Sequence, residues 1–122
     1  MQTLTYHEAA RQLLTQSFDE LAEGDSRQVS EKGWGATAQM IKAIASNRGW
    51  KHDSHAALYK VIDRLVKETG DDTIRVGFST ANALHQNFYE NWGSTDYVAR
   101  GLARVRELVD RLEHLLEQDT PG

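Results

Sequence analysis

Apolar residues recur along most of this chain at intervals of three and four positions, the spacing of one face of an α-helix. The stretch over about residues 95–117 is the clearest, with a wide apolar seam. The seam residues are Val98, Leu102, Val105, Val109, Leu112 and Leu116, flanked by Leu108 and Leu115. No segment alternates convincingly between apolar and polar residues, and only residues 73–76 favour a strand. The pattern predicts an all-α protein.

Capping residues divide this pattern into five helices. Thr5 followed three positions later by Glu8 is typical of a capping box, and Asp25 with Gln28 opens the next helix. Gly49 is suited to end that second helix. The expected helices cover about residues 5–24, 25–47, 53–70, 72–91 and 95–117. The connections between them are short, which favours an up-and-down bundle of antiparallel neighbours.

Composition limits the class of protein. The chain has 122 residues, 39% of them hydrophobic and 26% charged, so we expect one domain over residues 1–122 with an ordered core of about 5–117. The absence of cysteine excludes disulfides and thiolate metal sites. A net charge of −4 disfavours a broad DNA- or RNA-binding surface. No long apolar run or signal-peptide core is present, so we expect a cytoplasmic protein that does not enter a membrane.

A glycine pair marks the second helix, where residues 31–36 read Glu-Lys-Gly-Trp-Gly-Ala. The usual phosphate-loop fingerprints need a preceding strand and further glycines or a Lys-Ser/Thr pair, and none is present. Glycine inside a helix costs up to about 1 kcal/mol relative to alanine, so the pair needs a compensating role. That role is either close helix packing beside Trp34 or a ligand-facing groove. Glu31 and Lys42 lie on one helical face and could flank such a groove.

Two histidines lie close together in sequence at positions 52 and 55. Histidines three residues apart can share a metal on one helical face, but a strong site needs three or four ligands. Because this pair spans the expected start of the third helix, we interpret His52 and His55 as surface or capping residues. No metal site and no cofactor is predicted.

The histidine of the fourth helix is the most informative residue of the chain. His85 falls in register with Phe78, Ala81, Phe88 and Trp92, which predicts a core-facing seam. A buried ring without a hydrogen-bond partner costs about 1–3 kcal/mol, so His85 needs a partner. One turn away on either side, Asn82 and Tyr89 could fix its tautomer, and Glu90 could do so only from a neighbouring face. His85 is therefore either a hydrogen-bonded structural histidine or a functional one.

Two motifs together resemble the HEPN superfamily. The first is the Glu-Lys-Gly-Trp-Gly-Ala of residues 31–36 followed by the Ala-Gln-Met-Ile-Lys-Ala of residues 38–43, and the second is the Leu-His-Gln-Asn-Phe-Tyr-Glu of residues 84–90. The closest resemblance is to its PaREP-like branch, over about residues 6–116. The resemblance implies a helical bundle that often dimerises. Many HEPN proteins are metal-independent ribonucleases or toxins, and others are non-catalytic partners of nucleotidyltransferases.

Catalytic HEPN members resemble one another in an arginine followed, after four to six intervening residues, by a histidine. His85 matches the histidine, but residues 78–80 are Phe, Ser and Thr where the arginine is expected, and Arg75 is too distant. The chain then lacks the cation that would bind and polarise a phosphate, which argues against ribonuclease activity. Arg48 and His55 have the required spacing, but Gly49 and the following helix cap interrupt any single helix between them.

The sequence therefore favours a non-catalytic HEPN-like interaction or ligand-binding module, expected as a homodimer. Its ligand would be nucleotide-like or RNA, or its partner a protein of the nucleotidyltransferase type. The expected ligand-binding residues are Glu31, Lys32, Trp34, Lys42, Asn82, His85, Asn87, Tyr89 and Glu90. One alternative is a metal-independent ribonuclease that uses His85 as general acid and base. The other is a purely structural helical oligomer.

Overall fold

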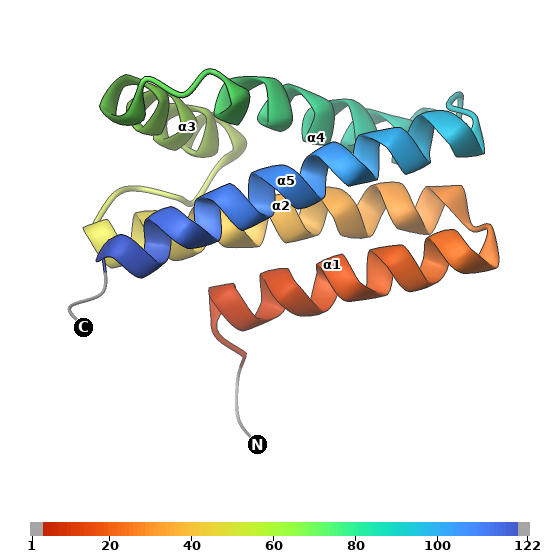
Figure 1. Cartoon of the computed structure of the whole chain (residues 1–122), viewed down its shortest axis with the longest axis horizontal. Coiled ribbons are helices and arrows are strands. Elements are labelled where there is room, and N and C mark those ends of the chain that lie inside the picture. The colour runs from red at the N-terminus through yellow and green to blue at the C-terminus, as the bar shows by residue number, and fades with distance from the viewer. Residues whose placement is uncertain (1–3, 120–122) are drawn as a thin grey trace.

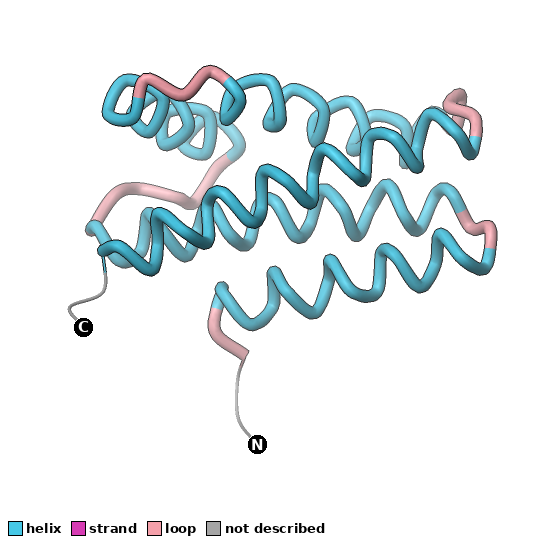
Figure 2. The backbone as a smooth tube through the Cα atoms, viewed as in Figure 1, coloured by secondary structure: helices cyan, strands magenta, loops and turns pink. Residues whose placement is uncertain are grey.

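The chain folds into five α-helices, as a computed structural model that describes residues 4–119 shows (Figure 1). The helices are α1 (Tyr6–Glu23), α2 (Ser26–Arg48), α3 (His55–Thr69), α4 (Thr73–Glu90) and α5 (Thr95–Asp119). The described residues contain no strand (Figure 2). The β-prone stretch at 73–76 forms the first turn of α4. The predicted all-α helical bundle is confirmed.

The caps explain why the helix boundaries were predictable. Thr5 and Glu8 form the complete capping box at the start of α1. Asp25 accepts a hydrogen bond from the Gln28 amide at 3.2 Å, and Ser54, not Asp53, caps α3. Each of these bonds satisfies an amide that would otherwise lack a partner at a helix start. The left-handed positions that end α1, α2 and α3 are held by Gly24, Gly49 and Gly70.

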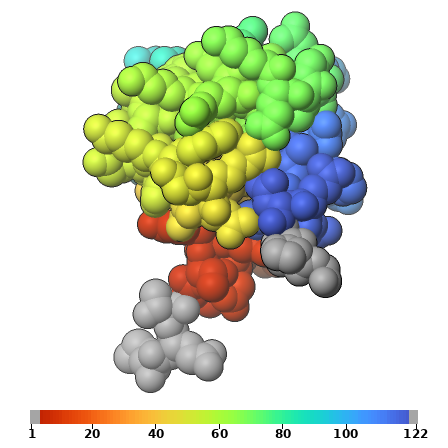
Figure 3. Space-filling model, turned by 90° about the vertical axis from the view of Figure 1, so that its left-hand side faces the viewer, coloured from red at the N-terminus to blue at the C-terminus, as the bar shows by residue number. Residues whose placement is uncertain are grey.

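Helix α2 lies at the centre of the bundle and packs against each of the other four helices. Figure 1 shows α1 and α4 running in one direction and α2 and α5 in the other. The shorter α3 follows the connection over residues 49–54 and packs against α2 and α4. Figure 3 shows that end of the molecule, where this connection, α3 and the last turns of α5 meet.

The core is built on large aliphatic side chains of α2, α3, α4 and α5. The apolar seam predicted for α5 is buried along its whole length. Small residues allow close approach: a Cβ added at Gly77 would lie 2.9 Å from the Cβ of Leu108, so α4 and α5 pack with almost no gap. Arg111 of α5 pairs with Asp71, in the turn before α4, at 3.0 Å.

The buried face of α4 differs from the predicted seam. The face consists of Ile74, Gly77, Phe78, Ala81, Leu84 and Asn87. Leu84 occupies the centre expected for His85, which is half-buried at the edge of the core. Trp92 is 52% exposed, because Asn91 takes a left-handed conformation and ends the helix before it. The seam prediction was wrong beyond Ala81.

No helix within residues 4–119 is both long and apolar enough to cross a membrane.

Candidate functional site

Four rings from α3 and α4 form a continuous row at the surface, in the order Tyr59, His55, His85 and Tyr89. The ring centroids are 5.3 Å apart for Tyr59 and His55, and 6.2 Å apart for His55 and His85. The edge-on contact between His85 and Tyr89 is 5.3 Å. We term these four residues the aromatic row. Tyr59 is 48% exposed and Tyr89 is 67% exposed, so both ends of the row face solvent.

Trp34 of α2 lies against the middle of the aromatic row. Its ring stacks on His55 at 5.0 Å with an interplanar angle of 23°, and on His85 at 4.9 Å with an angle of 28°. Helical spacing produces the row, because His55 and Tyr59 are one turn apart on α3 and His85 and Tyr89 are one turn apart on α4. Three helices thus contribute to one cluster of rings.

The glycines on either side of Trp34 serve close packing. A Cβ at Gly33 would lie 3.3 Å from Leu102 of α5, and one at Gly35 would lie 3.1 Å from Leu13 of α1. Of the two roles that the sequence left open for this pair, the geometry favours helix packing. Because both glycines face neighbouring helices, α2 sits deep enough for the Trp34 ring to reach the two histidines.

Asn82 orients His55, not His85. The amide oxygen of Asn82 accepts a hydrogen bond from Nε2 of His55 at 3.0 Å, and its amide nitrogen donates to the Tyr59 hydroxyl at 3.1 Å. This pair of bonds fixes the orientation of the α3 end of the aromatic row and assigns the proton of His55 to Nε2. The expectation that Asn82 or Tyr89 would hold the His85 tautomer was wrong.

Two buried polar atoms in this region lack a hydrogen-bond partner among the described residues. They are Nδ1 of His85 and Oε2 of Glu31, which precedes Trp34 by one helical turn. Buried polar atoms are almost always satisfied, and each exception calls for an explanation. The residues themselves are half-buried, so the two atoms lie close beneath the surface.

The electrostatics of the site act mainly on His85. Burial lowers the pKa of His85 below its usual value of about 6.5, because desolvation disfavours the imidazolium form. The charge that His55 can carry lowers this pKa further, and the carboxylate of Glu31 opposes both effects. His85 is therefore neutral at pH 7 and able to accept a proton or a hydrogen bond.

Two of the predicted ligand-binding residues are bonded to other residues of the fold. Lys32 forms an ion pair with Glu20 of α1 at 2.8 Å. Asn87 is fully buried, where its amide nitrogen donates to Ser30 at 2.9 Å and its oxygen accepts from the Gly93 amide at 2.7 Å. Asn87 therefore joins the end of α4 to α2 and to the following turn. Burial keeps Asn87 from a ligand, and Glu20 balances the charge of Lys32.

The other residues that the sequence singled out lie in different parts of the structure. Lys42 is half-buried and lies two turns beyond Trp34 along α2, and Glu90 is exposed at the end of α4. His52 contacts the Trp50 carbonyl oxygen at 2.9 Å and packs edge-on to Tyr6. Among residues 4–119, no three His, Asp or Glu side chains are arranged to hold a metal ion.

The arginine-histidine spacing of Arg48 and His55 does not form a site. The guanidinium of Arg48 pairs with Glu68 at 2.6 Å and with Asp119 at 2.8 Å. His55 instead contacts Trp34 and Asn82. The arginine therefore ties α2 to α3 and α5, and its charge is already neutralised.

Sequence reasoning missed His55 and Tyr59 as members of the site. Their spacing of four residues places two rings on one face of α3, and this signal was present in the sequence. The pair was not recognised, because His55 was interpreted as a surface or capping residue at the start of the helix.

Comparison with known proteins places the chain in a family. The sequence model of the archaeal PaREP1/PaREP8 family matches residues 5–109. No curated protein and no solved structure matches the chain significantly. Because the family model covers most of the chain, the chain belongs to the archaeal PaREP1/PaREP8 family.

Proposed function

We propose that this protein is a non-catalytic binding module whose aromatic row takes up a planar, nucleobase-like ligand. The observation that carries the proposal is the position of two unpartnered polar atoms, on Glu31 and His85, beside a row of partly exposed rings. A nucleobase has a flat face that stacks on such rings and an edge that carries hydrogen-bond donors and acceptors.

Stacking supplies the affinity in this proposal. Stacking of a base on an aromatic side chain contributes about 1–3 kcal/mol, and Tyr59 and Tyr89 present exposed rings for it. The polar atoms supply the selectivity, because a carboxylate oxygen accepts an N–H from the edge of a base. Leaving such an atom buried without a partner costs about 1–3 kcal/mol, which a matching ligand would offset.

Calorimetry with uncharged nucleosides tests this proposal. Adenosine, cytidine and uridine carry a base but no phosphate, so they test the aromatic row alone. We expect at least one to bind, with Tyr89→Leu and Glu31→Gln each weakening its affinity about tenfold. The matched controls Tyr97→Leu and Glu117→Gln, both on α5, should bind like the parent. No heat with any nucleoside at about 5 mM would overturn the proposal.

A metal-independent ribonuclease is the second candidate, and the pairing of two imidazoles favours it. His55 and His85 have ring centroids 6.2 Å apart on different helices, and His85 is neutral at pH 7, as a general base must be. In this mechanism His85 takes the proton of a ribose 2′-hydroxyl, and the 2′-oxygen attacks the phosphorus to form a 2′,3′-cyclic phosphate. His55 protonates the 5′-oxygen as its bond to phosphorus breaks. Incubation of an RNA oligonucleotide with the parent, His55→Ala and His85→Ala tests it. Equal cleavage by all three, or none by any, rejects it.

Three broader statements belong to the same proposal: membership of the HEPN superfamily, a homodimer and a cytoplasmic location. The five-helix bundle and the two sequence motifs support the first, and the absence of cysteine is in keeping with the third. Exposed apolar side chains on and after α4 and on α5, including Val76, Trp92 and Tyr97, support the second. Light scattering that gave only a 13.8 kDa species at micromolar concentration would contradict the homodimer.

A further inference from the structure

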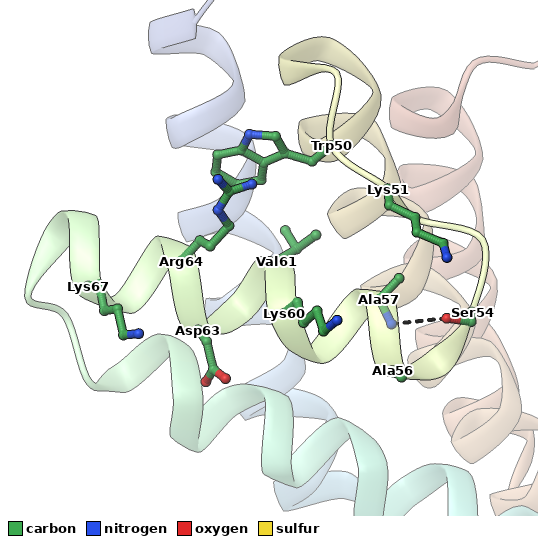
Figure 4. Close-up of a pocket in the computed structure, with 10 residues that line it drawn as sticks. All are labelled: Trp50, Lys51, Ser54, Ala56, Ala57, Lys60, Val61, Asp63, Arg64 and Lys67. Carbon is green, nitrogen blue, oxygen red and sulfur yellow. Dashed lines mark hydrogen bonds between the residues drawn. The ribbon is translucent and has the colours of Figure 1, made fainter.

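A cavity lies beside α3, next to the connection that precedes this helix (Figure 4). Its volume is about 520 Å³, within the range of small-molecule sites. It is lined by Trp50, Lys51, Ser54, Ala56, Ala57, Lys60, Val61, Asp63, Arg64 and Lys67. None of these residues belongs to the aromatic row, so the cavity is a separate feature of the surface.

The lining is strongly basic, although the whole chain carries a net charge of −4. The lining contains four cationic side chains, Lys51, Lys60, Arg64 and Lys67, and one carboxylate, Asp63. In Figure 4 Lys51 and Lys60 extend toward the start of α3, and Asp63 points away from them. A concentration of like charge on an oppositely charged protein indicates an anionic ligand.

The carboxylates near the cavity neutralise little of this charge. Asp63 pairs with Arg75 of α4 at 3.3 Å, outside the cavity. Lys51 approaches Asp53 at 3.9 Å, but both side chains are largely exposed, and such a pair is weak. Within residues 4–119, Lys60 and Lys67 have no carboxylate at ion-pair distance.

Trp50 gives the cavity a rigid wall. The guanidinium of Arg64 lies over its ring at 4.3 Å, and that of Arg48 lies over it at 4.9 Å. These cation–π contacts hold Arg64 beside the cavity. Its N–H donors lie in the plane of the guanidinium and stay available to a ligand. The cavity therefore combines a positioned guanidinium with the ammonium groups of Lys51 and Lys60.

We propose that this basic cavity binds the phosphoryl groups of a phosphorylated small molecule. Lys60, Lys51 and Arg64 contact the phosphate oxygens, and Lys67 adds to the positive field. The inference goes beyond the proposed function, because it holds whether or not the aromatic row binds a base.

The surroundings favour a small molecule over a nucleic acid. The basic residues 60, 64 and 67 lie on one face of α3, and the adjoining face carries Tyr59 of the aromatic row. The four cations of this cavity lie on α3 and on the connection before it, whereas a nucleic-acid interface needs cations along several phosphates.

The probe is inorganic tripolyphosphate, which has the phosphoryl groups and no base. Calorimetry should show binding that weakens as NaCl rises from about 0.05 to about 0.3 M, because the contacts are exposed to solvent. The double variant Lys51→Gln, Lys60→Gln should lose about tenfold or more in affinity. The control Arg100→Gln, Arg104→Gln removes the same charge from exposed positions of α5 and should bind nearly as the parent does.

Three results would overturn the inference. The first is no binding of tripolyphosphate at about 5 mM in low salt. The second is an equal loss of affinity in the cavity and control variants, which would show only a response to net charge. The third is binding of a single-stranded RNA about tenfold tighter than tripolyphosphate at the same salt, which would assign the surface to nucleic acid. The nucleoside experiment is unaffected by any of them, so the two proposals fail separately.

Discussion

Two regions of this molecule combine a histidine with a glutamate, and they differ in how completely their polar atoms are paired. Between α1 and α5, the carboxylate of Glu113 accepts from His7 Nε2 at 2.6 Å and from Arg11 Nε at 2.7 Å. Its other oxygen accepts from Arg11 Nη2, which also pairs with Asp110 at 2.9 Å. Both carboxylate oxygens of Glu113 are therefore satisfied within the fold.

Between α2 and α4 the same residue types are left incomplete. Oε2 of Glu31 and Nδ1 of His85 are buried without a partner among the described residues. The contrast indicates that the α1–α5 cluster stabilises the fold, whereas the region around the aromatic row has polar atoms that can still form hydrogen bonds. Stability measurements should separate the two.

The pKa shifts at the two regions have different origins. The guanidinium of Arg11 lowers the pKa of Glu113 to about 2, and the carboxylate raises the pKa of Arg11 in return. At His85 the lowering comes first from burial. A favourable ion pair thus lowers the pKa of Glu113, and the loss of hydration lowers the pKa of His85.

Acidification should have the largest effect and should act through the α1–α5 cluster. Since folding lowers the pKa of Glu113, its stabilisation is complete above its usual pKa of about 4.5 and is lost as the pH falls toward 2. The side chain of Glu113 is 21% exposed, so the shift corresponds to about 3 kcal/mol. Urea unfolding of the parent and of Glu113→Gln between pH 6 and 2 measures it. If the free energy of unfolding changes with pH in the same way for the two proteins, the prediction is contradicted.

Removing the arginine of the cluster should have the next largest effect. Arg11→Gln leaves Glu113 with His7 as its remaining side-chain partner, and we expect a loss of about 2 kcal/mol at pH 7. Chemical denaturation measures the loss. Arg104→Gln, an exposed position on α5, should change the stability by less than about 0.5 kcal/mol. A similar loss in both variants would mean that total charge matters and the cluster does not.

Helix boundaries could be predicted because local signals fix them. Thr5, Asp25 and the glycines at the helix ends act within one turn of the backbone, so the sequence alone identifies them. The buried face of α5 could be predicted for the same reason. The face of α4 could not, because the choice between Leu84 and His85 depends on how α4 packs against Gly101 of α5.

The candidate site was predicted in part. Trp34, His85 and Tyr89 do lie together. Helical spacing places His85 beside Tyr89, and the packing of α2 against α4 brings Trp34 to them. His55 joins them only through the path of the six-residue connection before α3, which no local signal fixes. Asn87 resembled a ligand-binding residue in sequence, but its partners Ser30 and Gly93 are contributed by tertiary packing and by the turn after α4.

A gain in stability is the third prediction and tests the incomplete region. Glu31→Met replaces a carboxylate that has an unpartnered buried oxygen with an apolar side chain of similar length. We expect the free energy of unfolding to rise by about 1 kcal/mol, because the cost of the unpaired atom disappears. Nucleoside binding should weaken in the same variant. If the protein instead loses stability as Arg11→Gln does, then Glu31 is paired in solution and the contrast between the two regions fails.

The smallest expected effect is on the titration of His85, followed by nuclear magnetic resonance of its ring protons. Because Glu31 opposes the lowering of the His85 pKa and His55 adds to it, Glu31→Gln should lower this pKa and His55→Gln should raise it. The lowered pKa also means that His85 contributes to stability above about pH 6.5 and that this contribution declines as the pH falls through the folded-state value. His114→Gln, at an exposed position on α5, should leave the titration unchanged. A His85 pKa above its usual value would show that the ring holds a proton for Glu31, and the aromatic row would then be as fully paired as the cluster around Glu113.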